Sequence, residues 1–237
     1  MVIENFIFVI SKLEKKLGVK FSNLDLLRQA VTHRSYLNEH RDYKLDHNER
    51  LEFLGDAVLE LVVTEYLYEN YPNPEGELTN WRAALVNGEM LSKISRKLGV
   101  EEHLLMSRGE AKDTGKARQY LLANAFESIT GAIYLDQKEN GYAAAKKFIL
   151  KNVVSELPNI IENKLYMDPK SRFQEVAQDK AGVTPSYRVM QESGPDHEKK
   201  FIIGVYLADE KIAEGEGLSK QEAQRNAAMA GLEVKGW

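Results

Sequence analysis

Residues 48–59, Asn-Glu-Arg-Leu-Glu-Phe-Leu-Gly-Asp-Ala-Val-Leu, combine closely spaced acids with an apolar pattern, and few folds accommodate both. In a helix, Glu49, Glu52 and Asp56 share one face, because side chains three and four positions apart are neighbours. Two like charges about 4 Å apart repel by roughly 4 kcal/mol at an effective dielectric constant of 20. A bound cation would relieve this repulsion. Exposure of the acidic face to water is the simpler alternative, and it requires no ligand.

Gly55 lies in the middle of this predicted helix, where a glycine costs about 1 kcal/mol relative to alanine. Close approach by another backbone or by a ligand would explain a glycine at this position. The neighbouring Leu51, Phe53 and Leu54 are apolar, so the other sides of the helix are expected to be buried. Acids on a helix with buried flanks favour a cation site over a solvated surface.

The composition is that of an ordinary globular protein, with 43% hydrophobic and 29% charged residues among 237. The absence of cysteine excludes disulfides and thiolate metal sites, and it fits a reducing compartment, so a cytoplasmic location is expected. The apolar start of the chain continues into an amphipathic pattern rather than a signal peptide. No apolar run approaches about 20 residues, so no membrane partner is expected. The net charge of −4 argues mildly against a polyanionic partner.

Helical periodicity dominates the first two-thirds of the chain. Apolar residues recur at three and four spacing in residues 3–17, 24–31, 48–70, 78–97, 119–136 and 142–155. No convincing strand precedes residue 180. These patterns predict an all-α domain at 1–155, followed by a linker at 156–167.

The periodicity changes after the linker. Asp168 is a predicted helix cap with a proline in the first helical position, and Ser219 is predicted to cap a final helix that runs to about Val234. Between these caps the sequence predicts a helix at 169–180 and strands at 185–192, 200–207 and 211–217. The tail at 168–237 is therefore expected to be a separate α+β domain with the order α-β-β-β-α.

A second acidic helix complements the first. Asn124 and Glu127 are one turn apart in an apolar segment, and a pair of helices that each present oxygen ligands one turn apart suits a magnesium ion. Glu75, in the loop after the first acidic helix, could reach the same cleft. A lone asparagine more commonly forms a hydrogen bond to a neighbouring residue than binds a metal. Glu127, however, lies between the apolar Phe126 and Ile129, where burial of an unpaired carboxylate is costly.

Residues 48–56 resemble the signature of the bacterial ribonuclease III family, which cuts double-stranded RNA. Further similar segments follow in the family's order: residues 32–35, Glu75 with Gly76, Gly109 with Glu110, and residues 123–127. The tail resembles a double-stranded-RNA-binding domain at residues 168–175, 194–197 and 219–228. The resemblance extends over essentially the whole chain.

The resemblance implies a metal-dependent hydrolase that acts on RNA phosphodiesters as a homodimer. It implies a divalent ion, Mg²⁺ or in its place Mn²⁺, bound by Glu52, Asp56, Asn124 and Glu127, with catalysis assigned to Asp56, Glu127 and Glu49. No organic cofactor is implied. The products would carry 5′ phosphates and short 3′ overhangs, and the substrates would include structured ribosomal and messenger RNA precursors. Phe53 and Gly55 are the candidates for the dimer interface.

The resemblance also implies an RNA-binding surface. Glu75 would assist RNA binding in the first domain, while Gln174 and Glu175 would meet one minor groove and His197 the next. Lys220 and Arg225 would face the phosphates between them. Without its Gly-Pro-Asp context, His197 would be interpreted as an ordinary loop residue. Residues 168–237 carry a formal charge of −2, so we expect modest affinity with a shallow salt dependence.

Two other functions remain open at this stage. The family usually has aspartate where this chain has Asn124, and loss of that charge would weaken the metal site. The chain could therefore bind double-stranded RNA with little or no cleavage. A metal-dependent phosphohydrolase of small molecules, built on a helical bundle, is the second alternative, and the predicted RNA-binding tail argues against it.

Overall fold

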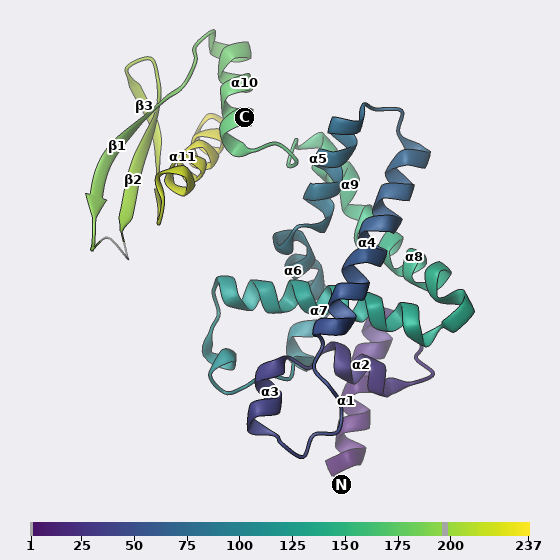
Figure 1. Ribbon diagram of the computed structural model, residues 1–237. Helices are drawn as coiled ribbons and strands as arrows, with labels where there is room; N and C mark the ends of the chain where they lie inside the picture. The colour runs from purple at the N-terminus through teal and green to yellow at the C-terminus, as the bar shows by residue number, and fades with distance from the viewer. Residues whose placement is uncertain (1, 196–198) are drawn as a thin grey trace. The chain divides into compact units, whose positions relative to one another are not determined.

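The chain forms two compact units, Met1–Asn163 and Lys164–Trp237 (Figure 1). The computed structural model describes residues 2–195 and 199–237. None of the helices in the described part of the chain combines the length and apolar character needed to cross a bilayer.

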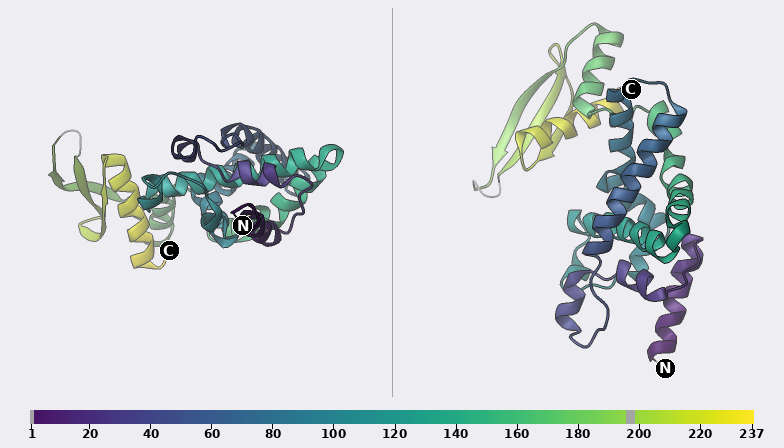
Figure 2. Two further views of the ribbon diagram at one scale, coloured as in Figure 1. Left: turned by 90° about the horizontal axis from the view of Figure 1, so that it is seen from below. Right: turned by 45° about the vertical axis from the view of Figure 1, so that its right-hand side comes forward.

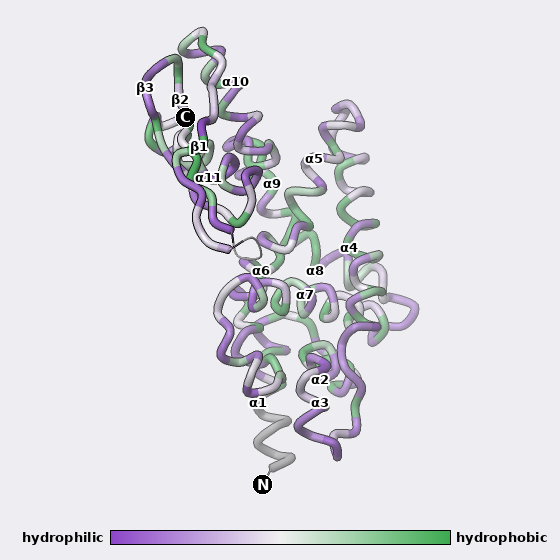
Figure 3. Tube along the Cα trace, turned by 60° about the vertical axis from the view of Figure 1, so that its left-hand side comes forward, coloured by the Kyte–Doolittle hydropathy of each residue, from purple (hydrophilic) through white to green (hydrophobic). Residues whose placement is uncertain are grey.

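The first unit is helical, as the apolar periodicity predicts. Its α-helices are α1 (Val2–Leu17), α2 (Leu24–Ala30), α3 (Arg34–Glu39), α4 (Glu49–Asn70), α5 (Glu75–Val86), α6 (Gly88–Lys97), α7 (Lys116–Asp136), α8 (Gly141–Asn152) and α9 (Leu157–Glu162). Short 3₁₀ turns are η1 (Val100–His103), η2 (Glu110–Lys112), η3 (Lys138–Asn140) and η4 (Val154–Glu156). Apolar residues concentrate along α4, α7 and α8, whereas the segment after α3 is polar (Figure 3).

The two long helices α4 and α7 cross at the centre of this unit (Figures 1 and 2). At the crossing their backbones touch: a Cβ atom on Gly55 would lie 1.7 Å from the carbonyl oxygen of Glu127. A Cβ on Gly131 would similarly lie 2.3 Å from the carbonyl oxygen of Leu51. The prediction that Gly55 permits close approach of another backbone is confirmed. The crossing places the acidic residues of α4 beside Asn124 and Glu127 of α7.

The predicted linker at 156–167 is largely helical. Pro158 lies in the first turn of α9, where proline is tolerated because its missing N–H has no helical partner, so it starts a helix instead of breaking one. Leu157 and Ile160 are buried, which ties α9 to the first unit. The boundary between the units accordingly falls after Asn163.

Two further elements differ from the sequence prediction. The helix expected at 78–97 is two helices, because Asn87 ends α5 and caps α6 by accepting the Met90 N–H at 2.9 Å. The six-residue α3 was not predicted, since it buries none of its residues and so has no apolar periodicity.

The second unit has the predicted order: α10 (Pro169–Ala181), β1 (Ser186–Ser193), β2 (Lys200–Leu207), β3 (Glu210–Gly217) and α11 (Lys220–Lys235). The strands form one antiparallel sheet in the order β1-β2-β3. Phe173 of α10, Val205 of β2 and Ala227 of α11 share one buried cluster, so both helices cover the same face of the sheet. Both predicted caps are confirmed: Asp168 accepts from the first turn of α10, and Ser219 accepts the Glu222 N–H.

Candidate active site

A cavity of about 290 Å³ opens beside the α4–α7 crossing, at the N-terminus of α4. It brings together three of the predicted site residues, Glu49, Glu52 and Asn124. The other lining residues are His33, Arg34, Asn48, Leu104, Met106 and Leu121. The wall that carries His33 is fixed by backbone pairing of residues 31–33 with Leu105, whose carbonyl accepts the His33 N–H at 2.8 Å.

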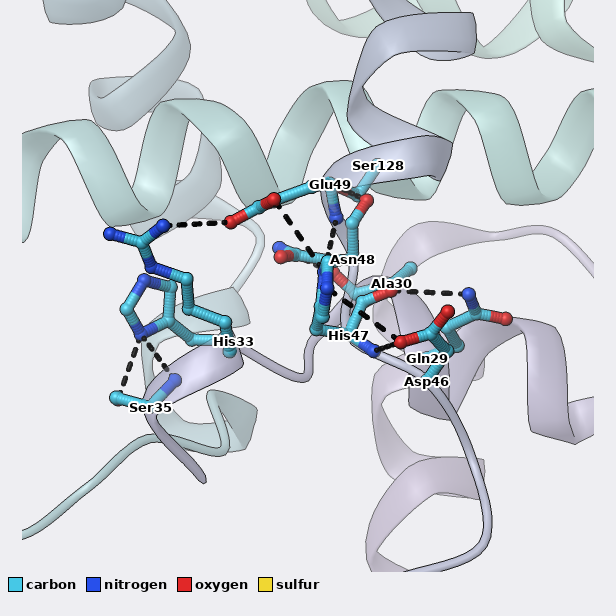
Figure 4. A network of polar contacts seen from close by, with 10 residues as sticks. Gln29, Ala30, His33, Ser35, Asp46, His47, Asn48, Glu49 and Ser128 are labelled. Carbon is cyan, nitrogen blue, oxygen red and sulfur yellow. Dashed lines mark hydrogen bonds and ion pairs between the residues drawn. The ribbon is translucent and has the colours of Figure 1, made fainter. Parts of the chain in front are cut away.

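Asn48 anchors the N-terminus of α4 in this position (Figure 4). Its side chain is buried and donates to the carbonyl oxygen of Ala30 at 3.4 Å. Its own carbonyl oxygen accepts from Ser128 Oγ at 3.3 Å, a contact that joins the start of α4 to α7. These bonds hold the first turn of α4 in register with the turn of α7 that carries Glu127.

Glu49 lies at the rim of the cavity in a polar network with two basic side chains (Figure 4). Its carboxylate is 3.6 Å from the guanidinium of Arg34 and 3.9 Å from Nδ1 of His47. His33 is oriented by a 2.8 Å hydrogen bond between its Nδ1 and Ser35 Oγ. Burial lowers the pKa of His33, which favours its neutral form at pH 7.

The carboxylates at the crossing repel one another. Burial, followed by the charges of Asp56, Glu52 and Glu60, raises the pKa of Glu127 to about 8. Burial and the charge of Glu49 also raise the pKa of Glu52, against a hydrogen bond from the Asn124 side chain that lowers it. Glu52 and Glu127 are half-buried and Asp56 is exposed, and a group of like charges with this much mutual repulsion is a place where a cation would be stabilised.

The donor set fits a hard divalent ion in its chemistry. Glu52, Asp56 and Glu127 supply carboxylate oxygens and Asn124 an amide oxygen, which are the ligand types of Mg²⁺. No three acidic or histidine side chains of the described residues are gathered tightly enough to coordinate one ion as they stand. Glu52 is instead held by a hydrogen bond from the Asn124 side chain.

Metal-free protein should lose stability as the pH rises, and Glu127 is the cause. Its pKa is about 8 in the folded state and 4.5 in the unfolded chain. The protonated side chain therefore stabilises the folded state below pH 4.5, and this stabilisation is lost as the pH rises to about 8. We expect the first unit to unfold more easily at pH 8.5 than at pH 5.5, by roughly 2–4 kcal/mol from this group. Urea unfolding in the presence of a chelator measures the difference.

Glu127→Gln serves as the matched comparison for this pH effect, because glutamine has nearly the same shape and does not ionise. We expect this variant to be the more stable protein at pH 8.5 and to show a flatter pH dependence. Identical pH profiles for the two proteins would contradict the raised pKa.

The sequence of each unit matches a known family model. The Ribonuclease-III-like model matches residues 23–157, and the double-stranded RNA binding motif matches residues 169–235. The chain belongs to the ribonuclease III family. Its activity is that of an endoribonuclease specific for double-stranded RNA, and its second unit binds double-stranded RNA.

Relatives match the chain over nearly its whole length. Ribonuclease 3 of Enterococcus faecalis is 44% identical in a match that covers 94% of this chain and 95% of that protein. Ribonuclease 3 of Nitratiruptor sp. is 42% identical in a match that covers 95% of this chain and 96% of that protein. The nuclease domain of ribonuclease III from Campylobacter jejuni shares 43% identity and a TM-score of 0.52, covering 60% of this chain and 97% of that structure.

The two predicted interface residues of this ribonuclease III lie in different environments. Phe53 is 83% exposed on α4. Gly55 is buried against the backbone of α7 within the same chain. Its assignment to the dimer interface stays a prediction. Leu61 and Tyr68 are exposed farther along α4, so apolar side chains other than Phe53 are available on this helix.

Glu75 is exposed at the start of α5 and does not line the cavity that holds Glu49 and Glu52. It accepts a hydrogen bond from Thr79 at 2.9 Å and borders a separate cavity of about 450 Å³ with Tyr68 and Arg82. The expectation that Glu75 reaches the cleft of the acidic cluster is therefore not met in this structure.

The predicted RNA-binding residues of the second unit are exposed where the structure describes them. Gln174 and Glu175 border a shallow groove along α10, and Glu175 pairs with Lys164 at 3.1 Å. Lys220 lies in the first turn of α11, and Arg225 is exposed on the same helix. His197 lies outside the described residues.

Three charged residues that shape these sites, Glu60, Arg34 and Glu192, were not predicted. Glu60 lies one helical turn beyond Asp56, so continuing the series Glu49, Glu52 and Asp56 by one more turn would have predicted it. Glu60 pairs with Arg82 at 3.0 Å. The only sequence feature that could have indicated Arg34 is its position next to His33. No sequence feature indicated Glu192 of β1, because the residues that contact it are distant in sequence.

Proposed function

We propose that this ribonuclease III hydrolyses double-stranded RNA as a homodimer with the help of Mg²⁺, in the cytoplasm, and leaves 5′ phosphates and short 3′ overhangs. The observation that carries the proposal is the crossing of α4 and α7. There, burial together with the nearby charges of Asp56 and Glu52 raises the pKa of Glu127 to about 8. The absence of cysteine supports the reducing compartment.

Glu52, Asp56, Glu127 and Asn124 would hold the metal ion. When bound, Mg²⁺ would activate a water molecule and stabilise the negative charge that develops on the phosphate and the leaving 3′ oxygen. Mn²⁺ takes the same oxygen ligands and should substitute. Glu49, held at the rim by Arg34 and His47, would assist from outside the ligand set.

The remaining assignments concern binding. Phe53, exposed on α4, is proposed as a dimer contact, and two active sites in the dimer would cut both strands. In the second unit, Gln174, Glu175 and His197 are proposed to meet minor grooves, and Lys220 and Arg225 the phosphates between them. Glu75 is proposed to contact RNA from its exposed position on α5.

A cleavage assay with matched RNAs tests this function. The full chain with Mg²⁺ should shorten a long perfect duplex to fragments with 5′ phosphates and 3′ overhangs, and should leave either strand alone intact. A duplex that is bound but never shortened would contradict the proposal in favour of RNA binding only. If a chain without residues 168–237 lost RNA affinity and still hydrolysed a small phosphodiester, a small-molecule phosphohydrolase would be favoured instead.

Asn124 sets the magnesium requirement. An amide oxygen can coordinate Mg²⁺ but adds no negative charge, so Asn124→Asp should lower the Mg²⁺ concentration for half-maximal cleavage about three- to tenfold. Asn124→Ala, which removes the oxygen altogether, should raise it. Titration of the initial cleavage rate with Mg²⁺ measures both shifts. Superimposable curves for the natural protein and Asn124→Asp would rule out a role for this residue in metal binding.

A further inference from the structure

One acidic side chain pairs with two lysines, Lys220 in the first turn of α11 and Lys199 directly before β2. The carboxylate of Glu192, near the end of β1, lies 2.7 Å from Lys220 Nζ and 3.5 Å from Lys199 Nζ. Both ammonium groups also lie over the ring of Phe201, at 5.5 and 6.0 Å from its centre. The carboxylate, the two lysines and the ring form one compact group, termed here the Glu192 cluster.

The Glu192 cluster occupies the place where a phosphate would bind. Lys220 is in the first turn of α11, where the backbone N–H groups and the helix dipole favour an anion. A phosphate that approaches Lys220 at hydrogen-bonding distance meets the carboxylate already bound there. The hydrogen bond from Lys220 also lowers the pKa of Glu192, which keeps this carboxylate ionised at neutral pH.

Other cations of the second unit have hydrogen-bond partners as well. Lys170 donates to the side-chain oxygen of Gln224 at 2.6 Å, and Arg172 donates to the carbonyl oxygen of Trp237 at 3.0 Å. With the second unit formally negative over 168–237, few positive charges are available to a duplex. Each lysine that a carboxylate occupies therefore matters for affinity.

We propose that Glu192 is an internal competitor for RNA phosphate, which occupies Lys220 and Lys199 in the free protein and is displaced when a duplex binds. The inference rests on the proposed role of Lys220 in RNA binding. Displacement breaks the ion pairs and leaves the Glu192 carboxylate beside the phosphates. Both effects offset part of the binding free energy that each new lysine–phosphate contact contributes. The result is weaker binding with a shallower salt dependence than the lysines alone would give.

Equilibrium binding of the full chain to duplex RNA, without divalent metal so that nothing is cut, tests the competitor. The duplex should have about 30 base pairs, which exceeds the roughly 16 that such a domain spans. We expect Glu192→Gln to tighten binding about three- to tenfold at low salt and to steepen the plot of log affinity against log salt by up to about one unit. Lys220→Gln should weaken binding, and adding Glu192→Gln to it should restore little.

Glu214→Gln is the matched control. Glu214 is an exposed carboxylate on β3 that pairs with Lys211 at 3.0 Å, and it lies opposite Gly204, away from Lys220. This variant changes the net charge by the same amount as Glu192→Gln and should alter affinity less than twofold.

The outcomes separate the competitor from the function on which it depends. If Lys220→Gln leaves affinity unchanged, the assignment of Lys220 to RNA binding fails, and the competitor fails with it. If Lys220→Gln weakens binding but Glu192→Gln tightens it no more than Glu214→Gln does, the competitor alone is overturned and the RNA-binding surface stands.

Discussion

Glu127→Gln should reduce cleavage of duplex RNA by about 10³-fold, because several kcal/mol of charge stabilisation depend on a negative ligand at this position. Glu127 is the most perturbed carboxylate at the α4–α7 crossing, with a pKa of about 8 that burial and the charges of Asp56 and Glu52 produce. Glutamine keeps the shape and one oxygen but removes the charge that would attract a divalent ion. The initial rate at saturating duplex and fixed Mg²⁺ measures the loss.

The loss should be confined to the chemical step. Duplex RNA affinity of Glu127→Gln should stay within about twofold of the natural protein, since the RNA-binding unit is untouched, and folding stability at pH 8.5 should rise as described above. Glu89→Gln, which removes an exposed acid from the first turn of α6, is the matched control and should cleave normally. Cleavage by Glu127→Gln within tenfold of the natural rate would remove Glu127 from the catalytic site.

Gly55→Ala should destabilise the first unit by about 3 kcal/mol or more, although alanine is the better helix former by about 1 kcal/mol. The added Cβ would lie 1.7 Å from the carbonyl oxygen of Glu127 and 2.8 Å from the backbone nitrogen of Gly131. Backbone atoms cannot rotate away as a side chain can, so α4 and α7 must separate. The change in the free energy of unfolding, from urea denaturation, measures the effect.

Gly76→Ala is the control for this substitution. Gly76 lies in the first turn of α5 with no heavy atom within 4 Å of the position its Cβ would take, so alanine should be neutral or slightly stabilising there. Because Glu127 contributes the atom that Gly55→Ala displaces, cleavage should fall along with stability. A Gly55→Ala protein as stable as the natural one would show that the two helices do not meet as closely as described.

Local sequence signals predicted most of the fold. The caps Asp168 and Ser219 have oxygen side chains whose preference for helix starts depends on nearby N–H groups alone. The strands β1, β2 and β3 were predicted within one or two residues, since β-branched and aromatic residues favour strands and turn residues mark their ends. The short α3 and α9 lacked such signals, because α3 buries nothing and α9 has in its first turn a proline that resembles a helix breaker.

The candidate site was predictable where it depends on helical spacing and not where it depends on packing. Glu49, Glu52 and Asp56 follow from their positions on α4, and Gly55 correctly indicated a close backbone. The spacing of residues along the helix could not show that Gly55 faces α7 while Phe53 faces outward. It also could not find Glu192, whose partners Lys199 and Lys220 are brought to it only by the tertiary fold of the second unit.

Binding of Mn²⁺ to the RNA-free protein, followed by the electron paramagnetic resonance signal of the free ion, tests most directly whether α4 and α7 share one metal site. The natural chain should bind Mn²⁺ in competition with Mg²⁺. Asp56→Asn on α4 and Glu127→Gln on α7 should each weaken that binding by tenfold or more. Unchanged Mn²⁺ affinity in both variants would show that the acids of the two helices do not hold a common ion.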